Sequence, residues 1–260
     1  MEIVEHEGTL LTHGTVHASS YASDGIKLSS QDEQLISEYT LLIFINSKPA
    51  FKVVCTPTDL PELTAGRIIT ESGIDPSDII SIDICRSGNA ARVTVKGDAA
   101  SKLKDSRFPE VSTCCTDSIS LLNAGPDLPA LTSPVTDLSS LPLIIQKAEE
   151  DTDLHKLTGS SHSSILMYEG KLIYAAEDIG RHNALDKSVG RLYIRGLDPS
   201  KAVLYTTGRM PVDMIRKVIR ARIPVLISRQ RPTVEGVELA ARCNLRLIGN
   251  LRHDHYIIYA

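Results

Sequence analysis

Three short polar segments in the last third of the chain contain residue types that bind anions. They are residues 206–209, 228–233 and 249–250, and each follows a short apolar run. Arg209 and Arg229 offer planar, permanently charged forks that suit phosphate groups. We therefore expect a phosphate-bearing ligand, such as a nucleotide, at these segments. The alternative is that they are ordinary turns between strands and helices, whose arginines face water.

Two of these segments lead into helical patterns whose first turns could add to an anion site. Pro211 fits the first position of one helix, and Thr233 can cap the other. Helix N-termini offer free N–H groups and a positive dipole end, and Gly208 would let the backbone approach the ligand. The site is neither a P-loop nor a dinucleotide fingerprint, because G-x-x-x-x-G-K-[ST] and G-x-G-x-x-G are both absent.

The most unusual polar stretch of the chain is Glu-Asp-Ile-Gly-Arg-His-Asn-Ala-Leu-Asp-Lys at residues 177–187. His182 and Asp186 are four residues apart, as are Asn183 and Lys187, so each pair shares a helix face. His182 is the natural acid, base or hydrogen-bond donor of the group. The alternative is a surface helix stabilised by such pairs.

Cysteine is the other residue type that could do chemistry. The five cysteines are Cys55, Cys85, Cys114, Cys115 and Cys243. Their number is odd and no C-x-x-C pair occurs, which argues against a disulfide framework or a zinc ribbon and favours reduced thiols. Only Cys114 and Cys115 fall in an irregular segment. We expect the other three, at the ends of predicted elements, to be buried and inert.

The elements that must position the polar segments alternate over the last sixty residues. Strand-like runs at 202–206, 224–228 and 245–248 enclose helical patterns at 211–222 and 234–243. This alternation predicts βαβ units and a parallel sheet. Ligands bind such a sheet outside the carboxyl ends of its strands, which is where the three polar segments fall.

The rest of the chain divides by pattern into four stretches. They are a loosely structured leader over 1–37, a small α+β domain over 38–104, an irregular cysteine-bearing loop over 105–140, and an α/β nucleotide- or cofactor-binding domain over 141–260. In the small domain we expect strands at 39–46, 50–55, 79–85 and 91–96, and a helix from 58 to about 71. The last domain should begin with a helix at 142–156, a hairpin of 163–168 with 171–175, and a helix at 182–190.

Composition and charge narrow the class of protein. Apolar residues make up 42% and charged residues 23%, as in a globular protein. The acidic start has no apolar stretch of a secretory signal, and the apolar run at 41–45 is too short to span a bilayer, so we expect a cytoplasmic protein without membrane contact.

The charge is unevenly distributed. Residues 1–180 carry a net charge of -13 and residues 181–260 a net charge of +9, with 12 arginines in the second part. This asymmetry favours an anionic partner, or else a solvated basic face. Nucleic acid fits less well, because the whole chain is negative and aromatic residues are few.

Several motifs of the chain resemble those of one known family. Residues 177–187 resemble its E-D-[VI]-G-R-H-N-A-[VL]-D-K signature, and residues 158–162 its T-G-G-x-H. Residues 207–209 resemble its S-G-R, and residues 228–233 its S-R-x-x-P-T. Residues 56–73 resemble T-P-x-D-L…G…E-G. The chain is thereby identified, over residues 38–260, as a divergent member of the formate dehydrogenase accessory sulfurtransferase family (FdhD).

The resemblance implies a fold, a reaction and partners. The fold would be α/β, with a cytidine-deaminase-like C-terminal domain beside a smaller N-terminal α+β domain, in a homodimer. A cysteine desulfurase would pass persulfide sulfur to Cys114 or Cys115, and from there to the molybdenum bis-guanine-dinucleotide cofactor before its insertion into the catalytic subunit of formate dehydrogenase. A guanine nucleotide would mimic that cofactor. The expected cofactor-binding residues are His162, Arg181, His182, Asn183, Asp186, Lys187, Thr207, Gly208, Arg209, Ser228, Arg229 and Thr233.

The chain departs from the family pattern in the sulfur-carrying loop. The usual C-G-x-C-G is replaced by Ser-Thr-Cys-Cys-Thr-Asp at residues 112–117, and Ser160 replaces the second glycine of T-G-G-x-H. One accessible thiolate is enough to carry a persulfide. A cofactor-binding chaperone that moves no sulfur is the alternative. A zinc deaminase is excluded, because H-x-E and P-C-x-x-C are both absent.

Overall fold

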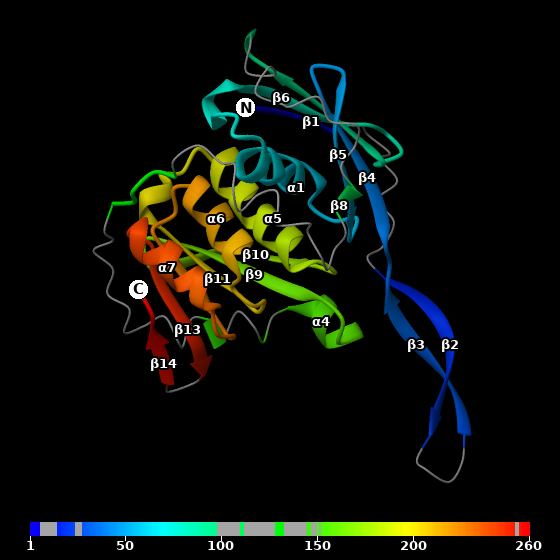
Figure 1. Cartoon of the computed structure of the whole chain (residues 1–260). Helices are drawn as coiled ribbons and strands as arrows, with labels where there is room; N and C mark the ends of the chain where they lie inside the picture. The colour runs from blue at the N-terminus through cyan, green and yellow to red at the C-terminus, as the bar shows by residue number, and fades with distance from the viewer. Residues whose placement is uncertain are drawn as a thin grey trace.

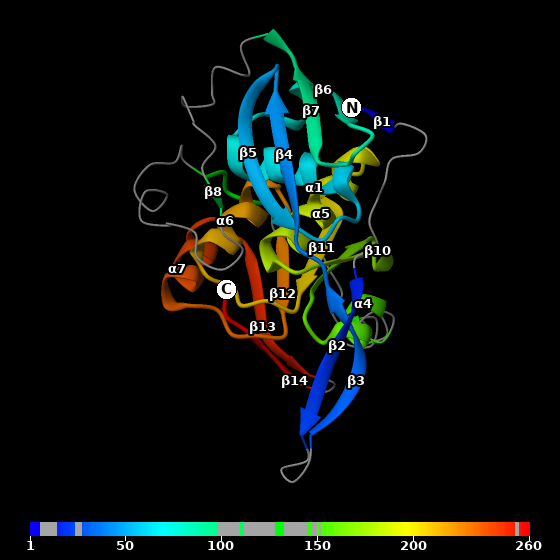
Figure 2. The ribbon, with the colours of Figure 1, turned by 90° about the vertical axis from the view of Figure 1, so that its right-hand side faces the viewer.

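The computed structural model describes residues 1–5, 15–23, 28–97, 110–111, 128–132, 145–146, 150, 152–252 and 255–260. Its strands form two six-stranded sheets and a separate two-stranded ribbon. Helices lie between the two sheets (Figures 1 and 2). The α/β class predicted from the sequence is confirmed at this level.

The first sheet belongs to the N-terminal half and has the order β1-β6-β7-β4-β5-β8. Its strands are β1 (Glu2–Glu5), β4 (Tyr39–Ile45), β5 (Lys48–Cys55), β6 (Ile79–Ile84), β7 (Ala90–Val95) and β8 (Glu110–Val111). Alternate residues of β4, such as Leu41 and Ile43, point into the core. Helix α1 (Leu60–Arg67) and the π-helix η1 (Ile68–Ser72) pack against this unit.

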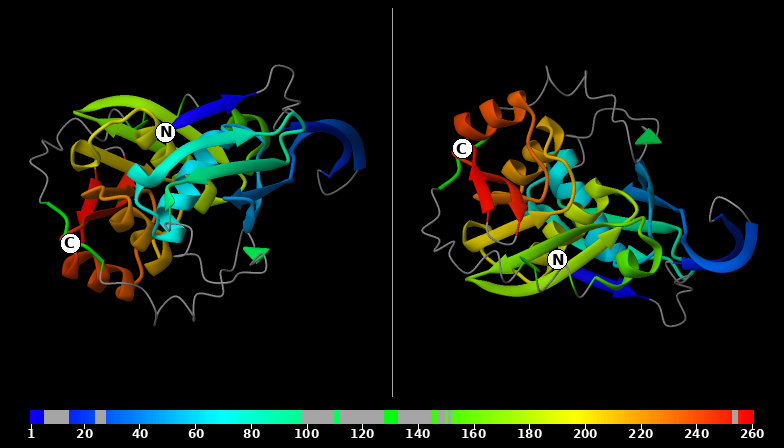
Figure 3. Two further views of the ribbon diagram at one scale, coloured as in Figure 1. Left: turned by 90° about the horizontal axis from the view of Figure 1, so that it is seen from above. Right: turned by 90° about the horizontal axis from the view of Figure 1, so that it is seen from below.

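Residues 1–37 are more regular than the sequence predicted. Strand β1 joins the first sheet as a parallel neighbour of β6. Strands β2 (Thr15–Ser23) and β3 (Leu28–Ile36) pair as a ribbon that projects from the body of the molecule (Figure 3). The ribbon sequence is mostly polar and lacks the apolar alternation of a half-buried strand, which is why the pattern did not reveal it.

The second sheet belongs to the C-terminal half and has the order β10-β9-β11-β12-β13-β14. Its strands are β9 (His162–Tyr168), β10 (Lys171–Asp178), β11 (Ala202–Thr206), β12 (Val225–Ser228), β13 (Arg246–Arg252) and β14 (His255–Ile258). Its helices are α5 (Arg181–Ile194), α6 (Val212–Arg220) and α7 (Val234–Arg242). The predicted parallel pairing holds for β11, β12 and β13, whereas β9, β10 and β14 are antiparallel.

Both faces of the second sheet are covered, which explains its continuous apolar strands. Along β11, Leu204 joins the core shared with the helices and the first sheet, whereas Val203 and Tyr205 point to the opposite face. On that face a second apolar cluster includes Ile145, which is itself buried.

Two of the sequence predictions have different outcomes: one is wrong, and the other falls mostly outside the described residues. Thr152 has an extended backbone, and helix α4 (Asp153–Thr158) begins only after it, so the predicted continuous helix over 142–156 is wrong. Cys114 and Cys115, and most of the predicted loop over 105–140, lie outside the described residues. No helix within the described ranges is both long and apolar enough to cross a membrane.

Candidate functional site

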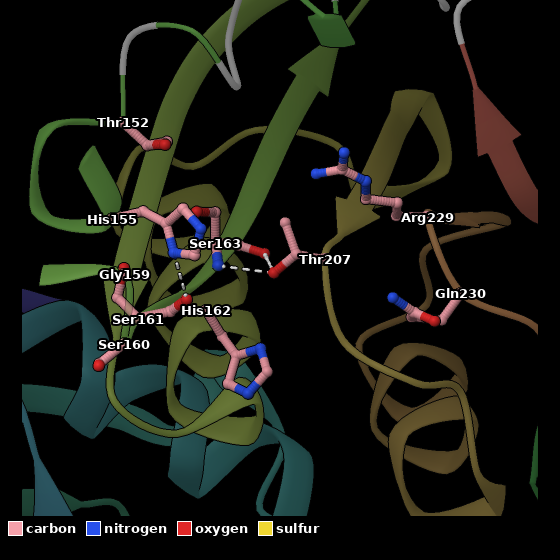
Figure 4. Close-up of a pocket in the computed structure, with 10 residues that line it drawn as sticks. All are labelled: Thr152, His155, Gly159, Ser160, Ser161, His162, Ser163, Thr207, Arg229 and Gln230. Carbon is pink, nitrogen blue, oxygen red and sulfur yellow. Dashed lines mark hydrogen bonds between the residues drawn. The ribbon is translucent and has the colours of Figure 1, made fainter. Parts of the chain in front are cut away.

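A cavity of 430 Å³ opens at the carboxyl ends of β11 and β12 (Figure 4). It is lined by Thr152, His155, Gly159, Ser160, Ser161, His162, Ser163, Thr207, Arg229 and Gln230. These residues present hydroxyl groups, two imidazoles, an amide and a guanidinium to the cavity. Such groups donate hydrogen bonds well to phosphate or carboxylate oxygens. The cavity therefore has the chemistry of an anion site, at the sheet edge where the sequence predicted a ligand.

The floor of the cavity is where β9 meets β11. The Thr207 N–H donates to the Ser163 carbonyl at 3.0 Å, and the Ser163 N–H donates to Thr207 Oγ1 at 3.0 Å. This exchange continues the strand pairing one residue beyond β11. Thr207 is thus held by both its backbone and its side chain, and its position is fixed before any ligand binds.

The two histidines of the cavity differ in their surroundings. His155 Nδ1 lies 2.9 Å from the Ser161 carbonyl, which can only accept, so Nδ1 carries the hydrogen. The pKa of His162 is lowered, first by burial and then by the nearby Arg181 and His155. His162 is therefore neutral at neutral pH and offers one donor and one acceptor.

Arg181 and Gly208 meet beside the cavity, which corrects the role predicted for Gly208. A Cβ atom at position 208 would lie 2.9 Å from Cβ and 3.0 Å from Cδ of Arg181. Glycine is therefore needed there to admit the aliphatic stem of Arg181. The Gly208 N–H is also occupied, because it donates to Thr206 Oγ1 at 3.1 Å. The buried Nε of Arg181 has no hydrogen-bond partner in the described part of the chain.

The predicted arginine segments contribute unequally. Arg229 lines the cavity, whereas Arg209 and Arg231 are exposed and do not. The Arg229 carbonyl accepts from Arg252 Nη1 at 2.7 Å, which holds its backbone and leaves its guanidinium at the cavity mouth. The cavity thus has one arginine in its wall and two more on nearby loops.

The helix N-termini of the predicted anion site do not line the cavity. Thr233 accepts from the Gly236 N–H at 3.2 Å, so its predicted capping role is confirmed. Pro211 stands one residue before α6, as its N-cap. Ser228 is buried and donates to the Gly208 carbonyl at 2.7 Å. These three residues stabilise neighbouring loops and helix ends, and none of them is part of the cavity lining.

The third predicted segment, residues 249–250, is not a loop. Strand β13 continues through it to Arg252, and the Asn250 N–H donates to the Gln230 carbonyl at 3.1 Å. A Cβ atom at Gly249 would lie 2.7 Å from that same carbonyl oxygen. The glycine therefore serves the close approach of two backbones, and the prediction that this segment follows the end of its strand was wrong.

Residues from both ends of the polar signature lie between the two halves of the molecule. Asp178 accepts from the Thr56 N–H at 3.1 Å and from Lys187 Nζ at 2.8 Å. Lys187 also donates to the Thr56 carbonyl at 3.3 Å and to Thr58 Oγ1 at 3.1 Å. Asp178 and Lys187 are completely buried, and Thr56 belongs to the N-terminal motif that resembles T-P-x-D-L.

Asp186 is the centre of a second buried group. It contacts Arg67 Nε at 3.1 Å, accepts from Thr70 Oγ1 at 2.8 Å, and accepts from Lys217 Nζ at 2.9 Å. Lys217 also pairs with Glu71 at 2.6 Å. Burial raises the pKa of Glu71, but the charges of Lys217 and Arg67 outweigh burial, so this pKa is lowered. We call these two groups, centred on Asp178 and Asp186, the interface network.

Close helix packing brings the network together. Asn183 accepts from Arg67 Nη2 at 2.6 Å and donates to the Val54 carbonyl at 2.7 Å. A Cβ atom at Gly66 of α1 would lie 1.8 Å from the Asp186 carbonyl oxygen, and one at Gly190 of α5 would lie 1.9 Å from the Glu62 carbonyl oxygen. The two helices touch backbone to backbone because each has a glycine at the crossing.

His182 lies between the network and the cavity. Its Nε2 is 2.7 Å from Asp213 Oδ2, so the four-residue pairing with Asp186 expected from the sequence does not form. Burial lowers the pKa of His182 although Asp213 opposes this. Burial raises the pKa of Asp213, but hydrogen bonds from His182 and the Met214 N–H, together with nearby positive charge, outweigh it and lower that pKa to about 2. Asp213 thus stays ionised and orients the ring.

The described cysteines are only partly as predicted. Cys55 and Cys243 are buried, and burial raises the pKa of Cys55 to about 12, so Cys55 is inert. Cys85 is half-buried in the turn between β6 and β7, which corrects the prediction of a buried thiol. Burial raises the pKa of Cys85, but hydrogen bonds from Ser87 and from the Ala90 N–H outweigh burial, so the pKa of this thiol is lowered. No group of three potential metal ligands occurs in the ranges described.

These features define an α/β protein with an anion-suited cavity at a sheet edge and a buried network joining its two halves. The FdhD/NarQ family model matches residues 36–260, and the chain belongs to that family. It is 28% identical over 240 residues to the sulfur carrier protein FdhD of Listeria innocua, covering 88% of this chain and 90% of the relative. It is 28% identical to the sulfur carrier protein FdhD of Acinetobacter baylyi, covering 87% and 86%.

A solved structure, described as a formate dehydrogenase accessory protein of Desulfotalea psychrophila, has the same fold. The TM-score is 0.76 at 24% sequence identity, over 94% of this chain and 96% of that one. In this structure, the family signature at residues 177–187 forms one side of the contact between the two halves of the molecule. Its partner motif, residues 56–73, supplies the other side.

The predicted site residues thus fall into three places. His162, Thr207 and Arg229 line the cavity, and Arg181 and Gly208 lie beside it. Asn183, Asp186 and Lys187 belong to the interface network, where their contacts are with protein. The sequence did not single out Thr152, His155, Ser163 and Gln230. The T-G-G-x-H resemblance did point to the wall at residues 159–161.

Proposed function

We propose that this chain carries sulfur for the maturation of a formate dehydrogenase. A cysteine desulfurase supplies the sulfur as a persulfide, and the acceptor is the molybdenum bis-guanine-dinucleotide cofactor, which is the cargo of the protein. Family membership and the names of the two relatives support the carrier role. The proposal includes a cytoplasmic location, a homodimer and a cytidine-deaminase-like arrangement of the C-terminal half.

The observation that carries the proposal is the lining of the cavity. A guanine dinucleotide presents phosphate oxygens, which need charged and hydroxyl donors. Arg229 and Thr207 offer such groups at the cavity, and Arg181 adds an unpartnered buried nitrogen beside it. His162, as a neutral ring, can donate to an oxygen without adding charge. The residues present therefore fit a phosphate-bearing cofactor.

The sulfur step needs a thiol, and the described lining of the cavity contains none. The thiolate of Cys114 or Cys115 attacks the terminal sulfur of the desulfurase persulfide, a new S–S bond forms, and the desulfurase cysteine leaves as its thiolate. Release of that sulfur as sulfide consumes two electrons, which two molecules of a low-molecular-weight thiol supply as they are oxidised to a disulfide. In the second candidate function, a cofactor chaperone, the cavity is used in the same way and the cysteines are not used at all.

Persulfide loading separates these two functions. The reduced protein is incubated with a cysteine desulfurase and cysteine, and intact mass and peptide mapping are recorded without reductant. We expect one added sulfur on the Cys114–Cys115 peptide, lost in the C114A/C115A variant and kept in the matched C85A variant. No added sulfur, while the desulfurase loads a control acceptor, would remove the carrier function and leave the chaperone, and sulfur on Cys85 alone would remove Cys114 and Cys115 as the carrying residues.

A further inference from the structure

We propose that Glu177 is the positioning residue of the cavity wall formed by helix α4. It fixes His155 and Ser161 in the orientation in which they face the ligand, although it does not itself line the cavity. This inference rests on the proposed function, in which the cavity binds the phosphate-bearing cofactor. It assigns a role to the first residue of the family signature, separate from the interface role of its neighbours.

Helix α4 depends on contacts with other parts of the chain for its position. It has six residues, too few for a helix that is stable in isolation, and its N-cap Thr152 makes no side-chain capping bond. Instead, Glu177 of strand β10 accepts from the Leu154 N–H at 2.9 Å and from the His155 N–H at 2.8 Å. These are free donors of the first turn, where a negative charge is favourable. A carboxylate distant in sequence thus caps the helix.

The same carboxylate reaches the other side of the wall. Ser161 Oγ donates to Glu177 Oε1 at 2.9 Å, and His155 Nδ1 donates to the Ser161 carbonyl at 2.9 Å. The three residues form a closed ring of hydrogen bonds. Both His155 and Ser161 line the cavity, and Figure 4 shows them side by side. With Nδ1 committed, the ring of His155 presents Nε2 as its remaining polar atom.

Strand geometry explains why Glu177 does this and its neighbour does not. Successive side chains of a strand point to opposite faces. Glu177 faces α4, whereas Asp178 faces Thr56 and Lys187 in the interface network. Strand β10 is therefore held on one side by the network, and it presents a fixed carboxylate on the other side. The wall is positioned relative to that fixed point.

The experiment compares E177A and E177Q with wild type by three measurements. They are amide hydrogen exchange over residues 152–161, the tautomer of His155 by nitrogen-15 NMR, and the Kd for GDP. In E177A we expect exchange to be about tenfold faster, the fixed Nδ1-protonated tautomer to be lost, and the Kd to rise about tenfold, as for charge-assisted hydrogen bonds. In E177Q the amide oxygen can still accept from His155 N–H and Ser161 Oγ, so all three should recover in part.

The matched control is D198A. Asp198 caps a short helix in the same way, by accepting from the Ser200 N–H at 3.0 Å, but it lies before β11, at the opposite sheet edge from the cavity. It should change none of the three measurements. Wild-type protection and the wild-type tautomer in E177A would overturn the inference, whatever happens to GDP. Failure of wild type to bind GDP would count against the proposed function, while exchange and tautomer would still decide the role of Glu177.

Discussion

The polar stretch at residues 177–187 contributes to the interface network and, through Glu177 and Arg181, to the surroundings of the cavity, yet the network and the cavity differ in burial and in hydrogen-bond partners. Asp178, Asp186 and Lys187 are completely buried, and each has several charged or polar partners from the protein itself. The cavity presents Arg229, which is exposed, and beside it lies Arg181, whose buried Nε has no partner among the described residues. A buried charge must be satisfied internally, whereas a binding site must leave donors for its ligand. The comparison teaches that a dense polar motif can serve stability and binding together.

The largest effect should come from removing the centre of the network. D186A leaves Arg67 and Lys217 buried without their shared carboxylate, and breaking such a group costs about 4 kcal/mol. Urea unfolding should show this loss directly. The matched control E169A removes an exposed carboxylate, 57% accessible, from its pair with Lys201 and should leave the unfolding midpoint unchanged. Equal midpoints for D186A and wild type would contradict the assignment.

A smaller loss of stability should follow from adding a side chain where helices α1 and α5 cross. In G66A the new methyl group would lie 1.8 Å from a backbone oxygen, so α1 and α5 must separate. Overpacking of this kind costs about 3 kcal/mol at the upper end of its range. Thermal unfolding measures it, with K156A on the exposed face of α4 as a control. A G66A variant as stable as wild type would mean that the helices are not in backbone contact.

A substitution in the cavity wall should weaken ligand binding and leave the stability of the fold unchanged. R229A removes a guanidinium that has no hydrogen-bond or ion-pair partner among the described residues, and we expect the Kd for GDP to rise about tenfold with an unchanged Tm. R231A, which removes the same charge from an exposed residue outside the lining, is the matched control. Calorimetric titration distinguishes them. Equal losses in both variants would indicate a diffuse charge effect and not a built site.

The smallest effect concerns pH. The pKa of His162 in the folded chain is lowered from 6.5, first by burial. Below pH 6.5 the unfolded chain therefore binds more protons than the folded chain, and the free energy of unfolding falls as the pH falls. Above pH 6.5 His162 contributes no such dependence. Urea unfolding across this range should show a flatter decline in H162Q than in wild type, and identical curves would contradict the shift.

Much of the fold was predictable from local pattern. The strands at 202–206 and 224–228 and the helices between them follow from apolar periodicity, which the tertiary structure did not override. The ribbon of β2 and β3 was missed because its residues are polar. The helix predicted at 142–156 was wrong at Thr152, since a helical pattern does not show where a distant carboxylate will start the helix.

The candidate site was predictable in part. His162, Thr207 and Arg229 were named because residue types and strand ends are local properties. His155 was not named, because nothing near it in sequence indicates that Glu177 will bring it to a cavity wall. Gly208 was named for the wrong reason, since the approach it permits is that of Arg181, 27 positions earlier in the chain.

The sequence by itself determined the family, the α/β class and the sheet edge at which the polar cavity opens, because motifs, periodicity and strand ends depend on neighbouring residues. Only the tertiary structure decided which polar residues stay available. Asp186 and Lys187 are as polar as Arg229, but they are paired with Arg67, Lys217 and Asp178 across an interface that the sequence does not display. Charge is a property of a residue, whereas whether that charge is satisfied depends on what the fold brings to it.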